Sequence, residues 1–221
     1  MIFQYALAET LIGQAIAMIG KSPLNPSVIS KLRTLFPEIP QEAVYEAIDI
    51  AQGTIHARQS GKFSDKFSDW LFTKQTFEQS TSDTIAEHHA SRFDNCESIL
   101  EICTGSGIDT SAQAASGRAV TTIEADNTIA ALAGRNFQHH GIGTITLLEG
   151  RAEDVALQEL SKAQFDGIWA DPSRRTSEGS RKSLSAQDYQ PDLNWIMNIP
   201  HTGVMGIQVS PALPIEDLPE G

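Results

Sequence analysis

Cysteine is scarce in this sequence, and its placement argues against a disulfide-stapled or zinc-binding protein. Cys96 and Cys103 are the only two cysteines, seven residues apart, and no Cys-x-x-Cys pair or histidine at zinc-ligand spacing accompanies them. We therefore expect no metal site, and a reducing compartment, the cytoplasm.

An excess of positive charge and a long apolar run are also missing. The chain of 221 residues carries a net charge of −12, which argues against non-specific coating of nucleic acid, because phosphate binding depends on clustered Lys and Arg. The apolar start, residues 1–20, lacks a basic segment and is interrupted by Gln4, Glu9 and Gln14. We expect neither a signal peptide nor a membrane span. The 40% hydrophobic and 20% charged fractions are typical of a soluble globular protein.

The third glycine of a dinucleotide-binding turn is missing from the stretch around which the chain is organised. Residues 98–110 read SILEICTGSGIDT, an apolar strand that breaks at Gly105 and Gly107 into a helix. The fingerprint G-x-G-x-x-G/A requires a small third residue, but Thr110 stands there. What remains, E-x-x-x-G-x-G from Glu101 to Gly107, resembles motif I of the class I S-adenosylmethionine methyltransferases.

This resemblance implies S-adenosylmethionine as cofactor. Glu101 would help to hold its amino-acid part, and Glu124, at the end of the second expected strand and followed by Ala125 and Asp126, would accept hydrogen bonds from the ribose hydroxyls. Arg151 stands where many relatives have an aspartate, so Glu153, Asp154 or the backbone around Ala152 would contact the adenine. The full set of implied cofactor residues is Phe72, Thr81, Glu101, Cys103, Thr104, Gly105, Ser106, Gly107, Glu124, Ala125, Ala152, Glu153 and Asp171.

The segment before the glycine turn carries a second resemblance. Residues 79–82, Gln-Ser-Thr-Ser, followed by Ile85 and Ala86, are similar to the segment before motif I in the cap-guanine-N2 type and related bacterial RNA methyltransferases. There the threonine turn and its helix close over the cofactor, and we expect a helix N-cap among residues 80–82. The alternative is that the aromatic residues between 63 and 77 only dock a helical domain on the sheet.

The sequence FDGIWADPSRR resembles the D/N-P-P-aromatic motif of amino-directed methyltransferases. In that motif the carboxylate and a neighbouring carbonyl accept hydrogen bonds from the target amine, and the residues implied as catalytic are Asp171, Pro172, Ser173 and Arg174. DPSRR is similar to the D-P-x-R-R form of a group of bacterial methyltransferases whose longer members add a THUMP-like C-terminal domain. We expect that domain to be absent from these 221 residues, and in longer relatives it would supply further RNA contacts.

A basic cluster follows the same motif. Arg174, Arg175, Arg181 and Lys182 fall within nine positions, and we expect them to bind an anionic substrate. A flexible, solvated loop is the alternative.

Periodicity predicts helices over residues 1–20, 28–36 and 41–59, forming an N-terminal helical domain of residues 1–68. Residues 69–221 are expected to form the α/β methyltransferase domain, a Rossmann-like parallel sheet of order 3-2-1-4-5 whose last two strands, a hairpin, are missing. Strands are expected at 119–124, 144–148, 167–170 and 203–210, besides the one before the glycine turn.

The resemblance implies methylation of a base nitrogen of RNA, hence a role in RNA modification. Two alternatives stay open: a small-molecule methyltransferase, and a non-catalytic cofactor-binding module of an RNA-modification assembly.

Overall fold

A computed structural model describes residues 2–218 except 5, 22–23, 161–163 and 175–184. By their contacts the residues form two compact units, each described here by itself. The first contains residues Met1–Ile85, Gly105–Ile108 and Asn127–Gly141, and the second contains Ala86–Thr104, Asp109–Asp126 and Ile142–Gly221. The boundary predicted at residue 68 is not tested by this division and stays a prediction.

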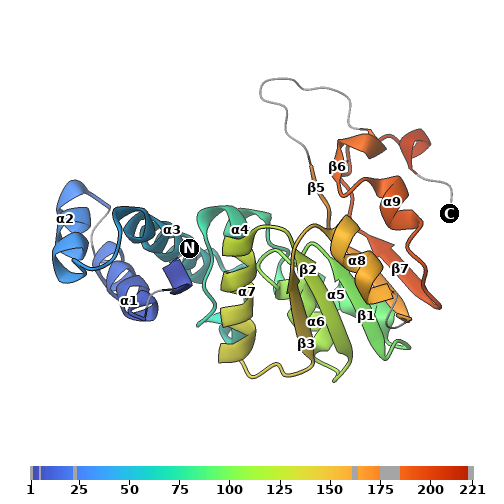
Figure 1. Ribbon diagram of the computed structural model, residues 1–221, viewed down its shortest axis with the longest axis horizontal. Helices are drawn as coiled ribbons and strands as arrows, with labels where there is room; N and C mark the ends of the chain where they lie inside the picture. The colour runs from blue at the N-terminus through green and yellow to red at the C-terminus, as the bar shows by residue number, and fades with distance from the viewer. Residues whose placement is uncertain (1, 5, 22–23, 161–163, 175–184, 219–221) are drawn as a thin grey trace. The chain divides into compact units, whose positions relative to one another are not determined.

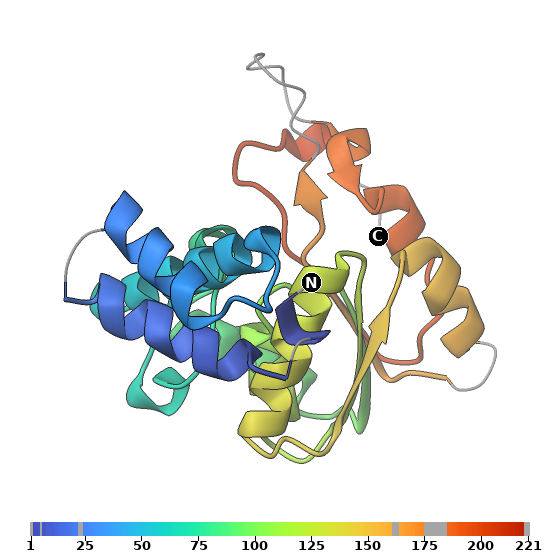
Figure 2. The same ribbon diagram turned by 60° about the vertical axis from the view of Figure 1, so that its left-hand side comes forward.

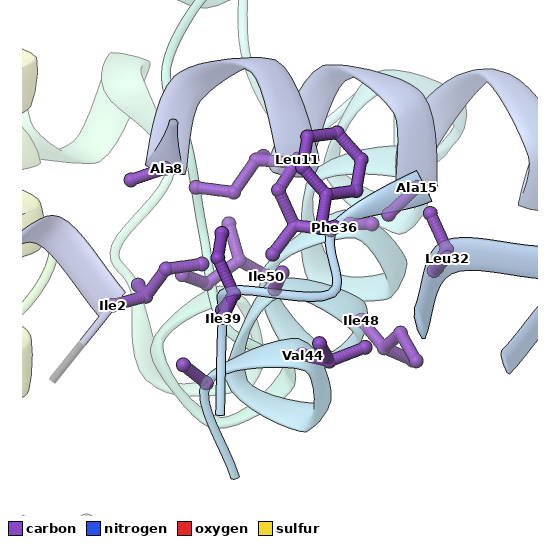
Figure 3. Close-up of a cluster of buried hydrophobic side chains, with 14 of the residues drawn as sticks. Ile2, Ala8, Leu11, Ala15, Leu32, Phe36, Ile39, Val44, Ile48 and Ile50 are labelled. Atoms are coloured by element: carbon purple, nitrogen blue, oxygen red, sulfur yellow. The ribbon is translucent and has the colours of Figure 1, made fainter. Parts of the chain in front are cut away.

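The first unit is built on a helical core (Figure 3). It contains α1 (Ala8–Ile19), α2 (Pro26–Leu35) and α3 (Gln41–Ser60), whose apolar faces meet at side chains such as Leu11, Leu32 and Ile50. The side chain of Asn25 caps α2 by accepting from the backbone N–H groups of Ser27 and Val28, and Gly61 ends α3 in the left-handed conformation. The predicted helices 28–36 and 41–59 are confirmed to within two residues.

The helix predicted over residues 1–20 was too long. A short 3-10 turn, Ile2–Gln4, precedes α1, which begins only at Ala8 without a side-chain cap. The separate turn lets Ile2 enter the helical core, where it is fully buried (Figure 3). Burial of one large side chain has decided where the helix begins, which the periodicity alone does not reveal.

A buried asparagine of this unit ties α7 to the segment that precedes α4. The side chain of Asn136, in α7 (Asn127–His139), accepts from the backbone N–H of Leu71 and donates to its carbonyl, each at 3.0 Å. Phe72, the next residue, donates its N–H to Thr54 Oγ1 in α3 at 3.1 Å, shortly before α4 (Lys74–Gln79) begins. The extended segment at residues 70–73 is thus held on both sides by side chains, because its own backbone groups have no ladder partner.

The second unit is a five-stranded parallel sheet (Figure 1). Its order is β3 (Ile145–Glu149), β2 (Ala119–Glu124), β1 (Ser98–Ile102), β4 (Gly167–Ala170) and β7 (Val204–Ile207). The predicted parallel α/β fold and the order 3-2-1-4-5 are confirmed. A second ladder of two antiparallel strands, β5 (Ser173–Arg174) and β6 (Tyr189–Gln190), was not predicted.

Helices cover both faces of this sheet, so it is doubly wound. Leu100 and Ile102 of β1 pack with Ala152 and Ala156 of α8 (Ala152–Leu160) and with α9 (Leu193–Met197), and Figure 2 shows both helices on the same side of the sheet. Ile99 faces the opposite way, into a cluster with Ala114 of α6 (Ile108–Ala114), Phe93 and Trp169. Because side chains alternate along a strand, Glu101 lies on this second face, toward α6.

The remaining short elements connect these. They are α5 (Asp83–Ala90) and the 3-10 turns Asp65–Phe67, Ser91–Phe93, Ala186–Asp188 and Ile215–Asp217. None of the helices in the described part of the chain combines the length and the apolar character that a membrane crossing needs.

Candidate active site

The carboxyl ends of three adjacent strands bring acidic residues to one edge of the sheet. β1 lies between β2 and β4, and all three run parallel. Glu124 is the last residue of β2, and Asp171 follows β4 directly, its N–H donating to the carbonyl of Ile102 in β1 at 3.2 Å. In open parallel sheets this edge is where ligands bind, so the sheet offers a candidate site with carboxylates on both sides of β1.

Glu101 lies one residue before the end of β1 and is almost fully buried. Its Oε2 accepts hydrogen bonds from the hydroxyls of Thr110 in α6 and Thr122 in β2. Burial raises the pKa of the Glu101 carboxyl to about 8, although both hydrogen bonds act in the opposite direction. Glu101 therefore connects β1, β2 and α6, and its role toward a cofactor stays a prediction.

The junction between β1 and the glycine turn has an unusual backbone. Cys103 has a φ of 72°, in the left-handed region that few residues other than glycine adopt. Its N–H and that of Thr104 both donate to the carbonyl of Ile123 in β2, at 3.0 and 3.2 Å. Burial raises the pKa of the Cys103 thiol, and Cys96 and Cys103 form no disulfide with each other. The bend at Cys103 is therefore held by the neighbouring strand.

Glu124 is buried, and its Oε1 accepts the backbone N–H of Asp126 at 3.0 Å. Its carbonyl accepts from Gly150, which joins the ends of β2 and β3, while Ala125 beside it is exposed. Glu124 thus lies at the ligand-binding edge of the sheet, and its role toward a ribose stays a prediction.

In the first unit, the two glycines of the turn differ in their surroundings. A Cβ built on Gly107 (φ +84°) would lie 2.5 Å from the ring of Phe137, whereas one built on Gly105 (φ +55°) would meet no atom of the described residues within 4 Å. Gly107 is therefore required by packing as well as by its φ, while the backbone at Gly105 is open to an approaching molecule.

The segment before α5 reaches the turn within this unit. Ser80 Oγ lies 2.5 Å from Ser106 Oγ in the glycine turn, and the buried Oγ1 of Thr81 has no hydrogen-bond partner among the described residues. The predicted N-cap is confirmed at Ser82, whose hydroxyl accepts from Ile85 N–H at 3.4 Å. Phe72 is buried and stacked on Phe63, with ring centroids 5.0 Å apart, and its contact with a cofactor stays a prediction.

The remaining predicted residues are divided between described and undescribed parts. Ala152 is buried at the start of α8, and Glu153 pairs with Arg151 at 3.0 Å. Pro172 is buried, whereas Ser173 is exposed in β5. The side chain of Arg174 and the whole of Arg175, Arg181 and Lys182 lie outside the described residues. Within the described part of the chain, no group of three or more His, Cys, Asp or Glu residues could hold a metal ion.

Two polar residues near Asp171 were missed by the sequence analysis. His89 Nδ1, near the end of α5, lies 2.8 Å from Asp109 Oδ1 in the first turn of α6, and its ring lies against Trp169 of β4 with centroids 4.6 Å apart. Burial raises the pKa of Asp171 to about 6, Asp109 adds to the rise and His89 opposes it. The only sequence signal for the pair of His89 and Asp109 was the run Ile-Asp-Thr at residues 108–110, and this run did not indicate His89 as a partner.

Comparison with known proteins gives the fold but no family. No family model and no curated protein matches the chain. The chain resembles the solved structure of a presumed methyltransferase from Porphyromonas gingivalis W83, at 17% sequence identity and a TM-score of 0.63, over 95% of this chain and 51% of that one. The chain thus spans about half the length of that protein. At this identity the likeness shows a shared Rossmann-like fold.

Weaker likenesses include an O-methyltransferase from Bacillus cereus in complex with SAH, S-adenosylhomocysteine, at 22% identity, a TM-score of 0.41 and 54% coverage of each chain. A SAM-dependent methyltransferase from Agrobacterium tumefaciens matches at 17% identity and a TM-score of 0.41, over 58% of this chain and 44% of that one. At such TM-scores neither adds to the argument.

Proposed function

We propose that this chain is an S-adenosylmethionine-dependent methyltransferase acting on a base nitrogen of RNA. The observation that carries the proposal is a pair of carboxylates at the ligand-binding edge of the sheet: Glu124 is the last residue of β2, and Asp171 directly follows β4, on the other side of β1. The shared fold with a presumed methyltransferase supports it.

Features of each unit fit S-adenosylmethionine. In the sheet unit, the buried Glu124 carboxylate can accept hydrogen bonds from the two hydroxyls of a ribose. In the helical unit, taken by itself, the space beside the Cα of Gly105 leaves room for a ligand, and the hydroxyl of Thr81, which has no partner among the described residues, is a group that a polar ligand could satisfy. When bound, the cofactor supplies an activated methyl group on a sulfonium centre.

The protein then has little acid–base chemistry to perform. Asp171 would accept a hydrogen bond from the acceptor amine and orient its lone pair, and burial would exclude water from that contact. As the amine gains a methyl group it gains positive charge, which the carboxylate of Asp171 stabilises.

RNA is the favoured substrate because four cations lie between residues 174 and 182, shortly after Asp171, on a chain of net charge −12. An arginine plane can stack on a base or bind phosphate, so Arg174 can take the place of the aromatic residue of related motifs. A small-molecule substrate would have no need of this cluster.

Cofactor binding is tested by isothermal titration with S-adenosylhomocysteine. We expect Glu124→Ala to weaken binding by about 1.5–3 kcal/mol, the cost of lost charged hydrogen bonds. Glu149→Gln is the matched control, because Glu149 is the register partner of Glu124 on β3 but is exposed. Binding of NAD without any response to S-adenosylhomocysteine would refute the assignment.

Catalysis is tested with Asp171→Ala and total cellular RNA. We expect affinity for S-adenosylhomocysteine to change by only a few-fold and turnover to fall by roughly 10²-fold or more, because transition-state alignment alone is lost. Replacing Arg181 and Lys182 with Ser should flatten the salt dependence of RNA affinity by at most about two units. If the parent chain binds no RNA at low salt but methylates a small amine, the small-molecule reading replaces RNA. Cofactor binding without methylation of any acceptor would favour the non-catalytic module.

A further inference from the structure

An imidazole, two carboxylates and an indole lie together on the α6 face of the sheet. Trp169 of β4 lies in register with Glu101 of β1. Asp171, just beyond the end of β4, continues this pairing because its N–H donates to the carbonyl of Ile102, so alternation places its side chain on the same face as Trp169. His89 lies against the Trp169 ring from α5, and Asp109 holds His89 Nδ1 from α6. Three elements distant in the sequence thus meet beside Asp171.

The hydrogen bond between His89 and Asp109 is short and partly shielded from solvent, so we expect it to be stably formed. The two side chains are 20% and 13% exposed, and the atoms that join them are 2.8 Å apart. A partly buried, charge-assisted hydrogen bond of this length is stronger than a surface ion pair. The tilted stacking of His89 on Trp169, at 34°, fixes the ring plane as well.

We propose that His89 and Asp109 are positioning residues that set the charge of the Asp171 carboxyl in opposite directions, and thereby the pH at which this site can orient an acceptor. Asp109 brings a second negative charge, which disfavours ionisation of Asp171, and a protonated His89 brings a compensating positive charge. The inference rests on the proposed function for its catalytic consequence, but not for its electrostatics.

The other titratable groups around Asp171 are on β1 and the turn after it. Glu101 and the thiol of Cys103 both interact electrostatically with Asp171, and Glu124 acts on Cys103. The pKa of Glu101 is raised to about 8 and that of the Cys103 thiol is also raised, so both are largely neutral near pH 6. Arg174, three residues beyond Asp171, is a further charge, and its side chain lies outside the described residues. Among the described groups, His89 and Asp109 are therefore the ones that can move the Asp171 titration near pH 6.

The test is the NMR titration of the Asp171 carboxyl carbon in the intact chain, assigned by its loss in Asp171→Asn. We expect a midpoint near pH 6 in the parent. Asp109→Asn should lower the midpoint and His89→Gln should raise it, each by at least about half a pH unit. His88→Gln is the matched control, because His88 is the preceding residue of α5 and its ring faces Arg92, 3.3 Å away, instead of Asp109.

Equal midpoints in all variants, or shifts of both in the same direction, would overturn the inference. If His89→Gln does not fold, His89→Asn replaces it, and an Asp171 midpoint that is unchanged in His89→Asn would refute the coupling. Shifted midpoints without methylation of any acceptor would leave the inference standing and the proposed function refuted. Methylation of an acceptor together with unshifted midpoints would support the proposed function and refute the inference. If the proposed function and the inference are both correct, the low-pH side of the pH–rate profile should shift in each variant by the same amount as the NMR midpoint of Asp171.

Discussion

The hydroxyl of Thr110, in the first turn of α6, donates a hydrogen bond to Oε2 of Glu101 in β1. Thr110 is the residue that breaks the dinucleotide-binding fingerprint, and the fold uses it to satisfy a buried acid. A small third residue would leave Glu101 with one fewer donor, and an unsatisfied buried carboxyl is costly.

The buried Glu101 leads to a prediction about stability and pH. Its pKa in the folded chain, about 8, lies above the ordinary 4.5, so the folded chain binds a proton between these values that the unfolded chain has lost. This contribution to the free energy of unfolding therefore declines as pH rises through the window, by at most about 1.4 kcal/mol per pH unit. Glu101→Gln should flatten the decline in urea unfolding at pH 5, 6.5 and 8. Glu149→Gln, which changes an exposed side chain, should retain it, and an unchanged slope in Glu101→Gln would contradict the assignment.

The glycine turn offers a matched pair of substitutions. Gly107→Ala should lower the free energy of unfolding by roughly 3 kcal/mol or more, because strain at positive φ adds to a collision with Phe137. Gly105→Ala carries the φ strain without the collision and should cost about 1–2 kcal/mol. Chemical denaturation distinguishes them, and equal losses would show that the Phe137 ring moves away.

At Cys103 we expect glycine to be more stabilising than alanine, the opposite of the usual order in ordered segments. Replacing alanine by glycine normally destabilises an ordered segment by roughly 0.5–1 kcal/mol. At φ 72° we expect Cys103→Gly to be more stable than Cys103→Ala by about 1 kcal/mol, because the left-handed strain is relieved. Thermal unfolding of the two variants makes the comparison, and a less stable glycine variant would mean that this backbone is not strained.

Asn136 should be among the costliest polar residues to remove. Asn136→Ala leaves both backbone groups of Leu71 without their partner in a buried place, and we expect a loss of roughly 2–4 kcal/mol. Gln138→Ala, two residues further along α7 and exposed, should change stability by less than about 0.5 kcal/mol. Hydrogen exchange of the Leu71 amide gives a local measure, because its protection should fall in the first variant only.

The strands could be predicted because each strand is a short apolar run bounded by glycine or an acidic residue, whereas their order followed from the resemblance to methyltransferases and not from the runs themselves. Strands β1, β2 and β4 carry the motifs themselves, and the predicted range of β4, residues 167–170, is confirmed without change. Helix ends were predicted less well where tertiary burial decided them, as at Ile2. The two-residue ladder of β5 and β6 is too short for any periodicity to reveal.

The candidate site was predictable only in part. Glu124 and Asp171 followed from their position at strand ends, which is a property of single segments. The pairing of His89 with Asp109 joins α5 to α6, and no pattern in either helix specifies the other. The assignments of individual cofactor and substrate residues stay predictions.

The place of β1 in the sheet has a consequence for how the chain folds. The register partners of β1 on β2 begin with Ala119, whereas those on β4 begin with Gly167. During synthesis β4 is therefore made much later than β2, and until then one edge of β1 has no strand to pair with. Until then that edge presents unpaired backbone groups beside apolar side chains, a template for wrong pairing with another chain. Pairing of β1 with β4 is also slow, because the chain between them must close a long loop, at a cost in entropy, before the stabilising contacts between the strands form. The most protected strand of the native sheet is therefore the one that is most exposed to aggregation while the protein is being made.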